Sequence, residues 1–378
     1  MKLFFCILLL FGLLGTGNAY AETVQIVPSV SAPSAILMEK LTGQVIYEKN
    51  AGKHTAPASV TKIMTMLLIA EEMDAGLLQT DDIVTASARA ASFGGSCVYL
   101  AEGERMTAAE MLKCIAVVSA NDCAVAMAEH ISGSEAAFVA RMNARAAQLG
   151  MENTHFTNCT GLFDDKEHYT CAYDVALMSR QLLQHEWIKE YSTIWMDSIR
   201  NGAFELSNTN RLVYWYDGCT GLKTGYTEKA GYCLAATAER DGVEYIAVVM
   251  NGATADSRNY DAEQMLSFAF ANYRLCSLRG DVKEPLIPVE LGRAETVKSI
   301  FAGPEYALIP KNSAEASYEL QCDKQVSAPV KRGDKLGVLT IRSDENVISR
   351  ISLLAAEDVD RLGYLGLLGY LAGCFVGL

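Results

Sequence analysis

The stretch Pro57-Ala58-Ser59-Val60-Thr61-Lys62 lies where a loop is expected to become a helix. Residues 59–73 lack Gly and Pro and are apolar on one side, which predicts a helix. The i, i+3 spacing then places Ser59 and Lys62 on one face, one turn apart. A hydroxyl becomes a nucleophile when a nearby base takes its proton, and a lysine with a lowered pKa can be that base. Composition alone produces Ser-x-x-Lys roughly once or twice in a chain of this length, so the motif is weak by itself.

Two further motifs follow along the chain. Ser119 and Asn121 fall between two predicted helices, where a hydroxyl and an amide are suited to relaying a proton and holding a substrate amide. Lys223 and Thr224 can bind a carboxylate by charge and hydroxyl donation, and Gly225 lets a substrate backbone pass close to an edge strand. Each motif alone is more often an ordinary surface or capping feature. The ordered triple is rarely accidental, and it predicts acyl-transfer chemistry at Ser59.

Predicted strands enclose a block of predicted helices. Two hairpins are expected, the first at residues 35–47 and the second at residues 231–250, which turns at the preferred Asp241-Gly242 pair. A capping box from Thr107 to Glu110 opens a helix that runs to about residue 118. The other predicted helices lie at 122–130, 134–149, 174–184 and 255–273. Strands at both ends of a helical block predict an α+β fold, in which helices sandwich an antiparallel sheet and form an inserted lobe.

The chain divides into four predicted parts. Residues 1–21, with an apolar run at 3–14 and a small-x-small site at 19–21, are expected to be a signal peptide, so the protein is expected to be exported. Residues 22–278 form the main domain, and residues 279–358, with short β-rich runs, form a small all-β domain. The apolar tail at 359–378 is expected to be a membrane anchor, and a helix buried on the β domain is the alternative interpretation.

Composition narrows the possible functions. The net charge is -13, which argues against a nucleic-acid partner because phosphate binding needs clustered Lys and Arg. The 11 cysteines are irregularly spaced and form no metal-ligand pattern, so most are expected to be small buried hydrophobes. The 5 histidines have no Asp partner at a recognisable spacing, and a Ser-His-Asp triad is therefore unsupported.

With its three motifs in this order, the chain resembles the penicillin-binding and serine β-lactamase superfamily. It is most similar to the low-molecular-mass D-alanyl-D-alanine carboxypeptidases, and the resemblance covers about residues 30–360. The segments outside the motifs that carry it are 35–50, 157–162, 168–174 and 355–359. The resemblance implies the transpeptidase-like fold followed by a β domain. It also implies an enzyme at the outer face of the cytoplasmic membrane, acting on peptidoglycan stem peptides that end in D-Ala-D-Ala, with no metal or other cofactor.

The resemblance also implies a role for each motif residue. Ser59 would attack the penultimate D-Ala carbonyl, Lys62 would be the general base, and Ser119 would pass a proton to the leaving nitrogen. Asn121 would bind the substrate amide and orient Lys62. In the remaining motif, Lys223 and Thr224 would bind the terminal carboxylate, and the backbone N–H groups of Ser59 and Tyr226 would form the oxyanion hole. β-Lactams would acylate Ser59 and leave slowly.

The sequence departs from the family pattern at three places. The segment 217–222, just before the third motif, contains more residues than is usual in the family. Tyr226 stands where many relatives carry His. The tail lacks the basic amphipathic character usual in the family, which puts the mode of membrane attachment in doubt.

Three other functions remain open from the sequence. A serine β-lactamase would need a dedicated deacylating Glu, for which no motif gives a candidate. A DD-endopeptidase that cuts wall cross-links would use the same site. A non-catalytic wall-binding protein is the third alternative.

Overall fold

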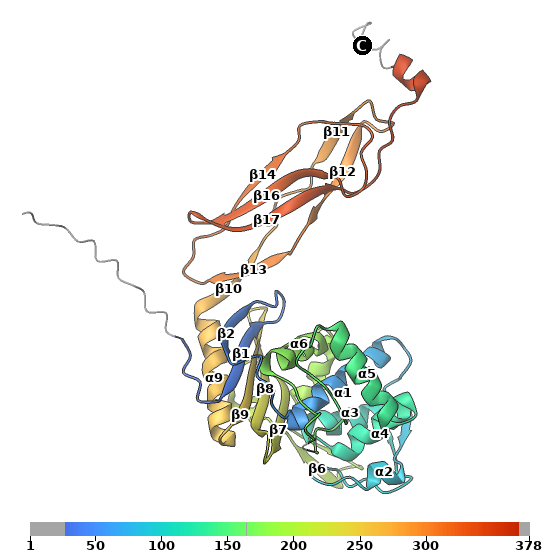
Figure 1. Cartoon of the computed structure of the whole chain (residues 1–378), viewed down its shortest axis with the longest axis vertical. Helices are drawn as coiled ribbons and strands as arrows, with labels where there is room; N and C mark the ends of the chain where they lie inside the picture. Colours follow the sequence, from blue (N-terminus) through green and yellow to red (C-terminus); the bar gives the residue numbers. More distant parts are fainter. Residues whose placement is uncertain (1–26, 164, 370–378) are drawn as a thin grey trace, which may run out of the picture.

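The computed structural model describes residues 27–163 and 165–369, and its centre is a five-stranded antiparallel sheet in the order β2-β1-β9-β8-β7 (Figure 1). The strands are β1 (Ser34–Glu39), β2 (Val45–Lys49), β7 (Cys219–Thr227), β8 (Gly231–Arg240) and β9 (Val243–Gly252). Both predicted hairpins are therefore confirmed. Asp241 (φ 52°) and Gly242 (φ 75°) both lie in the left-handed region that a two-residue hairpin turn requires.

Helices cover both faces of this sheet, and a hydrophobic core lies on each side (Figure 1). One face is covered by α9 (Ala255–Asn272), which packs on β8 and β9. The other face carries the helical lobe, whose larger members are α1 (Lys62–Asp74), α3 (Ala108–Val117), α4 (Asn121–Ser132), α5 (Glu135–Gln148) and α6 (Ala172–Leu182). The predicted α+β sandwich with an inserted helical lobe is confirmed.

Local signals place most helix ends to within one or two residues. The capping box at Thr107 forms, with the Glu110 N–H donating to Thr107 Oγ1 over 3.2 Å. Ser134 caps α5 by accepting from the Ala137 N–H. One prediction is wrong at its end: the helix expected to reach residue 273 stops at Asn272, and Tyr273 begins β10 (Tyr273–Ser277).

Short elements complete the first domain. The two small hairpins of the lobe are β3 (Ile83–Thr85) with β4 (Arg105–Thr107) and β5 (Met196–Ile199) with β6 (Phe204–Ser207). The short helices are η1 (Ala58–Thr61), α2 (Ala88–Ala91), η2 (Glu186–Ile188), α7 (Lys189–Ser192) and α8 (Leu212–Trp215).

The second domain is all β, as predicted, and has its own hydrophobic core. Its six-stranded sheet has the order β14-β16-β17-β12-β11-β15, and β13 pairs outside it with β10. The strands are β11 (Leu286–Glu290), β12 (Thr296–Ala302), β13 (Tyr306–Pro310), β14 (Ser317–Cys322), β15 (Val326–Ser327), β16 (Lys335–Ser343) and β17 (Asn346–Ala355).

Structured residues lie on both sides of each expected boundary of this domain. β10, which precedes residue 279, pairs with β13, and Val359, which follows residue 358, is buried in the β-domain core. Residues 364–369 then form a helix at the far end of the β domain (Figure 1). Within the described ranges, no helix has both the length and the apolar character to cross a bilayer. The predicted signal peptide and residues 370–378 of the predicted anchor lie outside the described residues.

Nine of the cysteines lie in the described part of the chain, and none of these nine forms a disulfide. Seven are buried, Cys219 is half-buried and Cys322 is exposed. The prediction that most cysteines are buried hydrophobes is therefore confirmed.

Candidate active site

Ser59 lies in a 3₁₀ turn, η1, at the entrance to α1. The sequence predicted that the helix begins at Ser59, whereas the α-helix proper begins at Lys62, because the first turn is tightened as helix N-termini often are. Ala58, just before the serine, has a left-handed φ of 48°, an uncommon conformation for a residue with a side chain. Thr61 Oγ1 donates to the Ala58 carbonyl over 2.8 Å and closes the turn. The turn is thus held in one strained conformation.

Lys62 is fully buried, and its Nζ contacts three oxygens. The distances from Nζ are 3.0 Å to Ser59 Oγ, 2.6 Å to Asn121 Oδ1 and 2.8 Å to the Thr160 carbonyl. Burial, which penalises the ammonium form, lowers the pKa of Lys62 to about 7, and the nearby acidic groups oppose this shift only in part. A neutral amine beside a hydroxyl is therefore accessible near neutral pH.

The second motif forms the link between α3 and α4. Ser119 is buried with φ 65°, and among the described residues its Oγ has no hydrogen-bond partner. Asn121 is the first residue of α4, and its Nδ2 donates to the Gly94 carbonyl over 2.8 Å, which directs Oδ1 to Lys62. The structure thus brings Asn121 to Lys62 and leaves the Ser119 hydroxyl unpaired, although buried polar groups normally find a partner.

The third motif lies on β7, the edge strand beside η1. Lys223 is buried, and burial, helped by the positive charges of Lys62 and Arg258, lowers its pKa well below the usual range. Thr224 Oγ1 donates to Thr209 Oγ1 over 2.7 Å. Lys223 Nζ donates to the Thr224 carbonyl over 3.0 Å, so the second lysine of the site lies beside the residue of the hydroxyl pair, and an incoming anion would favour its charged form.

Gly225 and Tyr226 complete the β7 segment. A Cβ on Gly225 would lie 2.9 Å from the Ser59 backbone nitrogen, so glycine allows β7 to approach the serine turn itself. The Tyr226 side chain is 54% exposed and packs on Tyr232, with the two ring centroids 4.4 Å apart. The tyrosine side chain thus lies outside the buried cluster formed by the other motif residues.

The segment 158–161, which the sequence marked only through the family resemblance, packs against the turn that holds Ser59. Gly161 has φ 72°, and a Cβ there would lie 1.8 Å from the Ala58 carbonyl oxygen. Asn158 Oδ1 accepts from the backbone N–H groups of Thr160 and Gly161 at 3.1 and 2.6 Å, which fixes the Thr160 carbonyl that Lys62 contacts. Apart from the family resemblance, the signal for this turn was an Asn three residues before a Gly, a common turn pattern.

His168 belongs to the same support. Its ring is buried, with Nδ1 accepting from the Thr157 N–H over 2.9 Å and Nε2 lying 2.9 Å from Thr61 Oγ1. Because Nδ1 is the acceptor, Nε2 carries the proton and donates to Thr61. This histidine therefore holds the serine turn rather than contacting Ser59.

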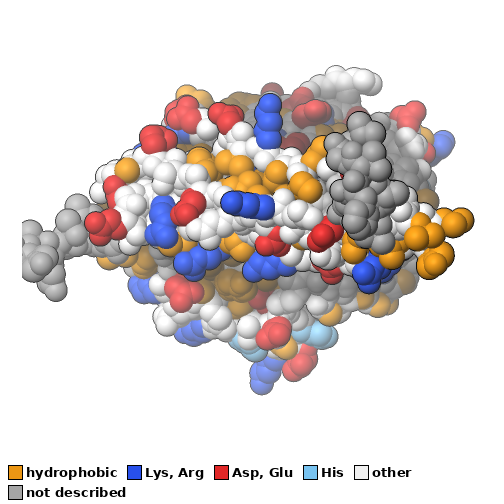
Figure 2. Space-filling model, turned by 90° about the horizontal axis from the view of Figure 1, so that it is seen from above, with side chains coloured by type: hydrophobic (Ala, Val, Ile, Leu, Met, Phe, Trp, Pro, Cys, Tyr) orange, Lys and Arg blue, Asp and Glu red, His pale blue; other side chains and the backbone are white. Residues whose placement is uncertain are grey.

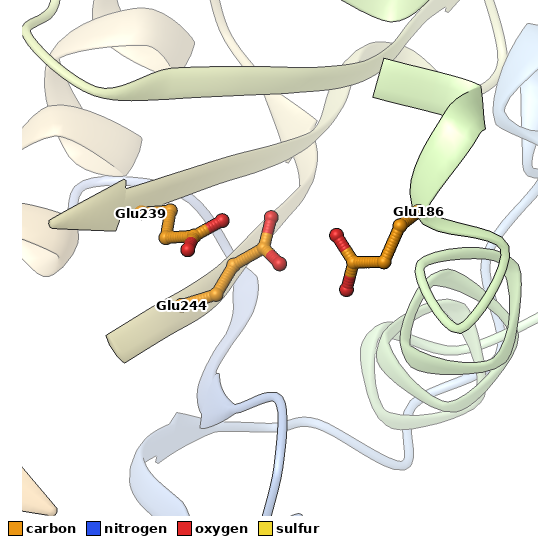
Figure 3. A group of neighbouring side chains, drawn as sticks. All are labelled: Glu186, Glu239 and Glu244. Carbon is orange, nitrogen blue, oxygen red and sulfur yellow. The ribbon is translucent and has the colours of Figure 1, made fainter. Parts of the chain in front are cut away.

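Away from the site, Glu186, Glu239 and Glu244 bring their carboxylates close together (Figure 3). Lys40 pairs with Glu186 and Glu244, and Lys189 pairs with all three acids. The two lysines thus balance two of the three negative charges. This network stabilises the β8–β9 hairpin end next to β7.

The comparisons with known proteins fit this geometry. Residues 21–254 match the family model described as D-alanyl-D-alanine carboxypeptidase, and residues 279–361 match the model described as penicillin-binding protein 5, C-terminal domain. The chain belongs to the D-alanyl-D-alanine carboxypeptidase family. The first model covers all three motifs, and the second covers the β domain.

Individual members of the family agree along most of the chain. The D-alanyl-D-alanine carboxypeptidase DacF of Bacillus subtilis is 42% identical over 88% of this chain and 87% of its own length. DacC of Escherichia coli is 30% identical over 93% of this chain and 90% of its own.

Solved structures of this family extend the match to three dimensions. Penicillin binding protein 5 of Haemophilus influenzae has a TM-score of 0.79 and 28% identity, covering 89% of this chain and 99% of its own. Penicillin-binding protein D2 of Listeria monocytogenes, solved in its ampicillin-bound form, has a TM-score of 0.59 and 31% identity, covering 64% of this chain and 98% of its own.

Proposed function

We propose that this chain is a serine-type D-alanyl-D-alanine carboxypeptidase that removes the terminal D-Ala from peptidoglycan stem pentapeptides through an acyl-enzyme on Ser59. The observation that carries the proposal is the 3.0 Å contact between Lys62 Nζ and Ser59 Oγ in a buried setting that lowers the lysine pKa to about 7. A hydroxyl paired with an amine that is partly neutral near pH 7 is the activated nucleophile that this reaction needs.

The first half-reaction forms the ester. Lys62 takes the Ser59 proton as Oγ attacks the penultimate D-Ala carbonyl, and the backbone N–H groups of Ser59 and Tyr226 receive the developing oxyanion. The carbon–nitrogen bond then breaks, and Ser119, whose Oγ has no hydrogen-bond partner among the described residues, passes a proton to the leaving D-Ala nitrogen. Water splits the ester in the second half-reaction and restores the Ser59 hydroxyl.

The remaining motif residues position the substrate. Lys223 and Thr224 bind the terminal carboxylate, since an anion there would restore the charged form of a buried lysine. Asn121, held by the Gly94 carbonyl, orients Lys62 and binds the substrate amide. Gly225 keeps the β7 edge clear, so that the peptide backbone can lie beside the strand.

The predicted export and membrane attachment form part of this proposal. Tyr364, Leu365 and Leu368 of the last described helix are 78%, 83% and 48% exposed. Figure 2, seen from the β-domain end, shows apolar side chains interspersed with Lys and Arg and with Asp and Glu on that face. Exposed apolar residues at the tip favour contact with a membrane surface by the C-terminal segment, at the outer side of the cytoplasmic membrane.

The test is to incubate purified protein with stem pentapeptide, and separately with nitrocefin. Wild-type protein is expected to release D-Ala from the pentapeptide and to be trapped by nitrocefin in a stoichiometric amount. Ser59→Ala is expected to do neither. Rapid, repeated nitrocefin hydrolysis without D-Ala release would instead identify a β-lactamase.

A further inference from the structure

A pocket lies at the junction of the two domains, where β10 and β13 meet (Figure 1). Its volume is about 420 Å³, and its wall comes from the β8–β9 hairpin, α9, β10, β13 and the residue after β13. No residue of the three motifs is among the described residues that line it. Pockets of several hundred Å³ are typical of sites for small molecules. This pocket is therefore a candidate binding site that the proposed reaction does not use.

The lining of the pocket is positively charged, although the protein as a whole is acidic. Arg240, Arg274 and Lys311 lie on three different segments, and the fold brings them to one pocket. Asp241, at the hairpin turn, is the one acid among the described lining residues. Three positive charges and one negative charge leave the lining at +2, in a chain of net charge -13. The sequence does not show this cluster, because its members are far apart along the chain.

Aromatic rings hold the Arg240 side chain in place. Its guanidinium carbon lies 4.8 Å from the centre of the Tyr216 ring and 4.5 Å from the centre of the Phe270 ring. Such cation–π contacts stabilise an arginine without using its N–H groups. Nε and Nη2 donate to the Asp217 carbonyl over 3.1 and 2.8 Å, and Nη1 makes no hydrogen bond to any residue that the structure describes. One nitrogen of a fixed guanidinium is therefore available to a ligand.

The other two cations also have unused N–H groups. Arg274 Nη2 donates to the carbonyls of Ser313 and Ala314 over 3.2 and 3.3 Å, while Nε and Nη1 have no hydrogen-bond partner in the described part of the chain. Lys311 is exposed, and its Nζ has no hydrogen bond or ion pair with a described residue. All three cations can therefore donate to a bound anion.

Two acids near the guanidinium groups compete only weakly with such an anion. The Asp217 carboxylate lies 3.6 Å from Arg240 Nε, and the Glu315 carboxylate lies 3.8 Å from Arg274 Nη2. These acidic side chains are 92% and 95% exposed, so solvent screens both pairs. An anion that contacts several of the cations at once would be favoured over either surface pair.

We propose that this pocket binds a small phosphate monoester, whose phosphate group lies among Arg240, Arg274 and Lys311. A phosphate monoester carries a charge of about −1.5 to −2 at pH 7, which matches the charge of the lining. Guanidinium groups also suit phosphate oxygens, to which they can donate two N–H groups at once. A carboxylate, with one negative charge, would leave part of the positive charge without a partner. The site does not involve Ser59 and is independent of the proposed reaction.

Aromatic side chains indicate where the organic part of the ligand lies. Tyr306 is 40% exposed and lines the pocket together with Phe270. The apolar face of a sugar or a similar ring can pack on these side chains, so we expect a sugar phosphate or another phosphorylated ring compound. Arg240 and Phe270 belong to the first domain, whereas Tyr306 and Lys311 belong to the β domain. A bound ligand would therefore contact both domains and hold them together.

Isothermal titration calorimetry of the full-length protein with glucose 6-phosphate tests the site. Wild-type protein is expected to bind one molecule per chain and not to bind glucose. Inorganic phosphate should bind at least about threefold more weakly, because the ring contact is lost. Lys311→Ala should weaken the binding of glucose 6-phosphate at least about fivefold, because one cation is removed, and Asp241→Asn should strengthen it. Lys298→Ala, which removes a 71% exposed lysine of β12 outside the pocket, is the matched control and should stay within about twofold of wild type.

Three results would overturn the site. The first is wild-type protein that binds neither glucose 6-phosphate nor inorganic phosphate, and the second is Lys311→Ala protein with wild-type affinity. The third is an equal loss of affinity in Lys311→Ala and Lys298→Ala, which would show only a general attraction between charges. Equal affinity for glucose 6-phosphate and inorganic phosphate would contradict the ring contact.

Two further measurements separate these results from other failures. The melting temperature of each variant without ligand shows whether it is folded. Labelling by penicillin should be unchanged in all three variants, because none of the substituted residues lies in the proposed active site. Loss of the phosphate site is therefore distinguishable from failure of the proposed function.

Discussion

Lys62 shows how burial and nearby acidic groups act against each other on the pKa of one residue. Its ammonium form is penalised by complete burial, yet three oxygens lie within hydrogen-bond distance of Nζ. Burial lowers the pKa to about 7, against the partial opposition of Cys159, Cys97 and Asp122, so the amine is divided between its two forms near neutral pH. A base in this range combines a useful population of the neutral form with enough basicity to take a hydroxyl proton.

The pH dependence of acylation follows from this pKa. Below about pH 7, Lys62 holds its proton and cannot accept one from Ser59, so the second-order rate constant for acylation by penicillin should fall about tenfold per pH unit. Above pH 7 the rate constant should reach a plateau. Stopped-flow quenching of a fluorescent penicillin at pH 5 to 9 measures it, and a rate that is flat from pH 5 to 7 would show that the base is a different group.

The sequence reveals the motif residues because their spacing is local or their order is distinctive. The resemblance marks the segments that hold Thr160, Gly161 and His168 and favours a structural role for His168, but the sequence does not reveal their contacts, because these are made with a turn about one hundred positions away. Every residue has a backbone carbonyl, so the identity of residue 160 does not indicate that its carbonyl accepts a hydrogen bond from Lys62. Only the assembled fold shows which backbone oxygen is involved.

At the scale of elements, η1, the turn that carries Ser59, lies between two segments that approach it at a glycine. Gly161 and Gly225 allow two segments to approach Ala58 and Ser59 more closely than a Cβ permits. The strands and helices around them were predictable from turn pairs and capping boxes. The close approach was not, since it depends on how β7 and the 158–161 turn dock on η1.

Gly161→Ala tests this close approach. Its Cβ would meet the Ala58 carbonyl oxygen at 1.8 Å and would also sit at φ 72°. We expect a loss of about 3–4 kcal/mol in the free energy of unfolding, from the left-handed conformation and the overpacking together. Acylation by penicillin should slow as the turn shifts. Urea denaturation and the acylation rate measure the two effects.

Gly150→Ala is the matched control, because Gly150 has φ 71° and open space around its Cβ position. It should cost only about 1 kcal/mol, with unchanged acylation. Equal losses of stability in the two variants would show that the conformation of Gly161, and not its contact with Ala58, is what matters.

The ion pairs of Glu244 with Lys40 and Lys189 are connected to β7 through Thr220. Glu244 Oε1 accepts from Thr220 Oγ1 over 2.7 Å, and its side chain is only 4% exposed between Lys40 and Lys189. Glu244→Gln should destabilise the protein by about 2 kcal/mol, because two largely buried lysines lose a shared partner. Thermal and urea unfolding measure this loss.

Glu186→Gln removes a charge from the same network at a site that is 63% exposed. Solvent screens that pair, so the variant should lose less than about 1 kcal/mol. A larger loss at Glu186 than at Glu244 would contradict the burial-based ranking.

At the scale of the whole molecule, the β domain lies between the catalytic domain and the last described helix (Figure 1). This arrangement would hold the active site away from a surface that the C-terminal segment contacts. The sequence predicted the order of the two domains, but it placed their boundaries by changes in composition. It therefore missed the pairing of β10 with β13 and the burial of Val359.

Removing residues 362–378 tests the proposed attachment. The shortened protein should leave the membrane fraction without detergent, because the exposed Tyr364 and Leu365 and the apolar residues after them are gone. Its kcat/KM on soluble pentapeptide should match that of the full chain. Cell fractionation with immunoblotting measures the partition, and shortened protein that remains with the membranes would show that another part of the molecule binds there.

The most direct test of the central claim is mass spectrometry of the protein after reaction with penicillin, followed by peptide mapping. A hydroxyl activated by the buried Lys62 amine should yield one penicilloyl adduct per molecule, located on Ser59. Ser59→Ala should yield none, and Lys62→Ala should react about a thousandfold more slowly, as expected when a general base is removed. An adduct on another residue, or a Lys62→Ala protein that reacts at the wild-type rate, would contradict the account.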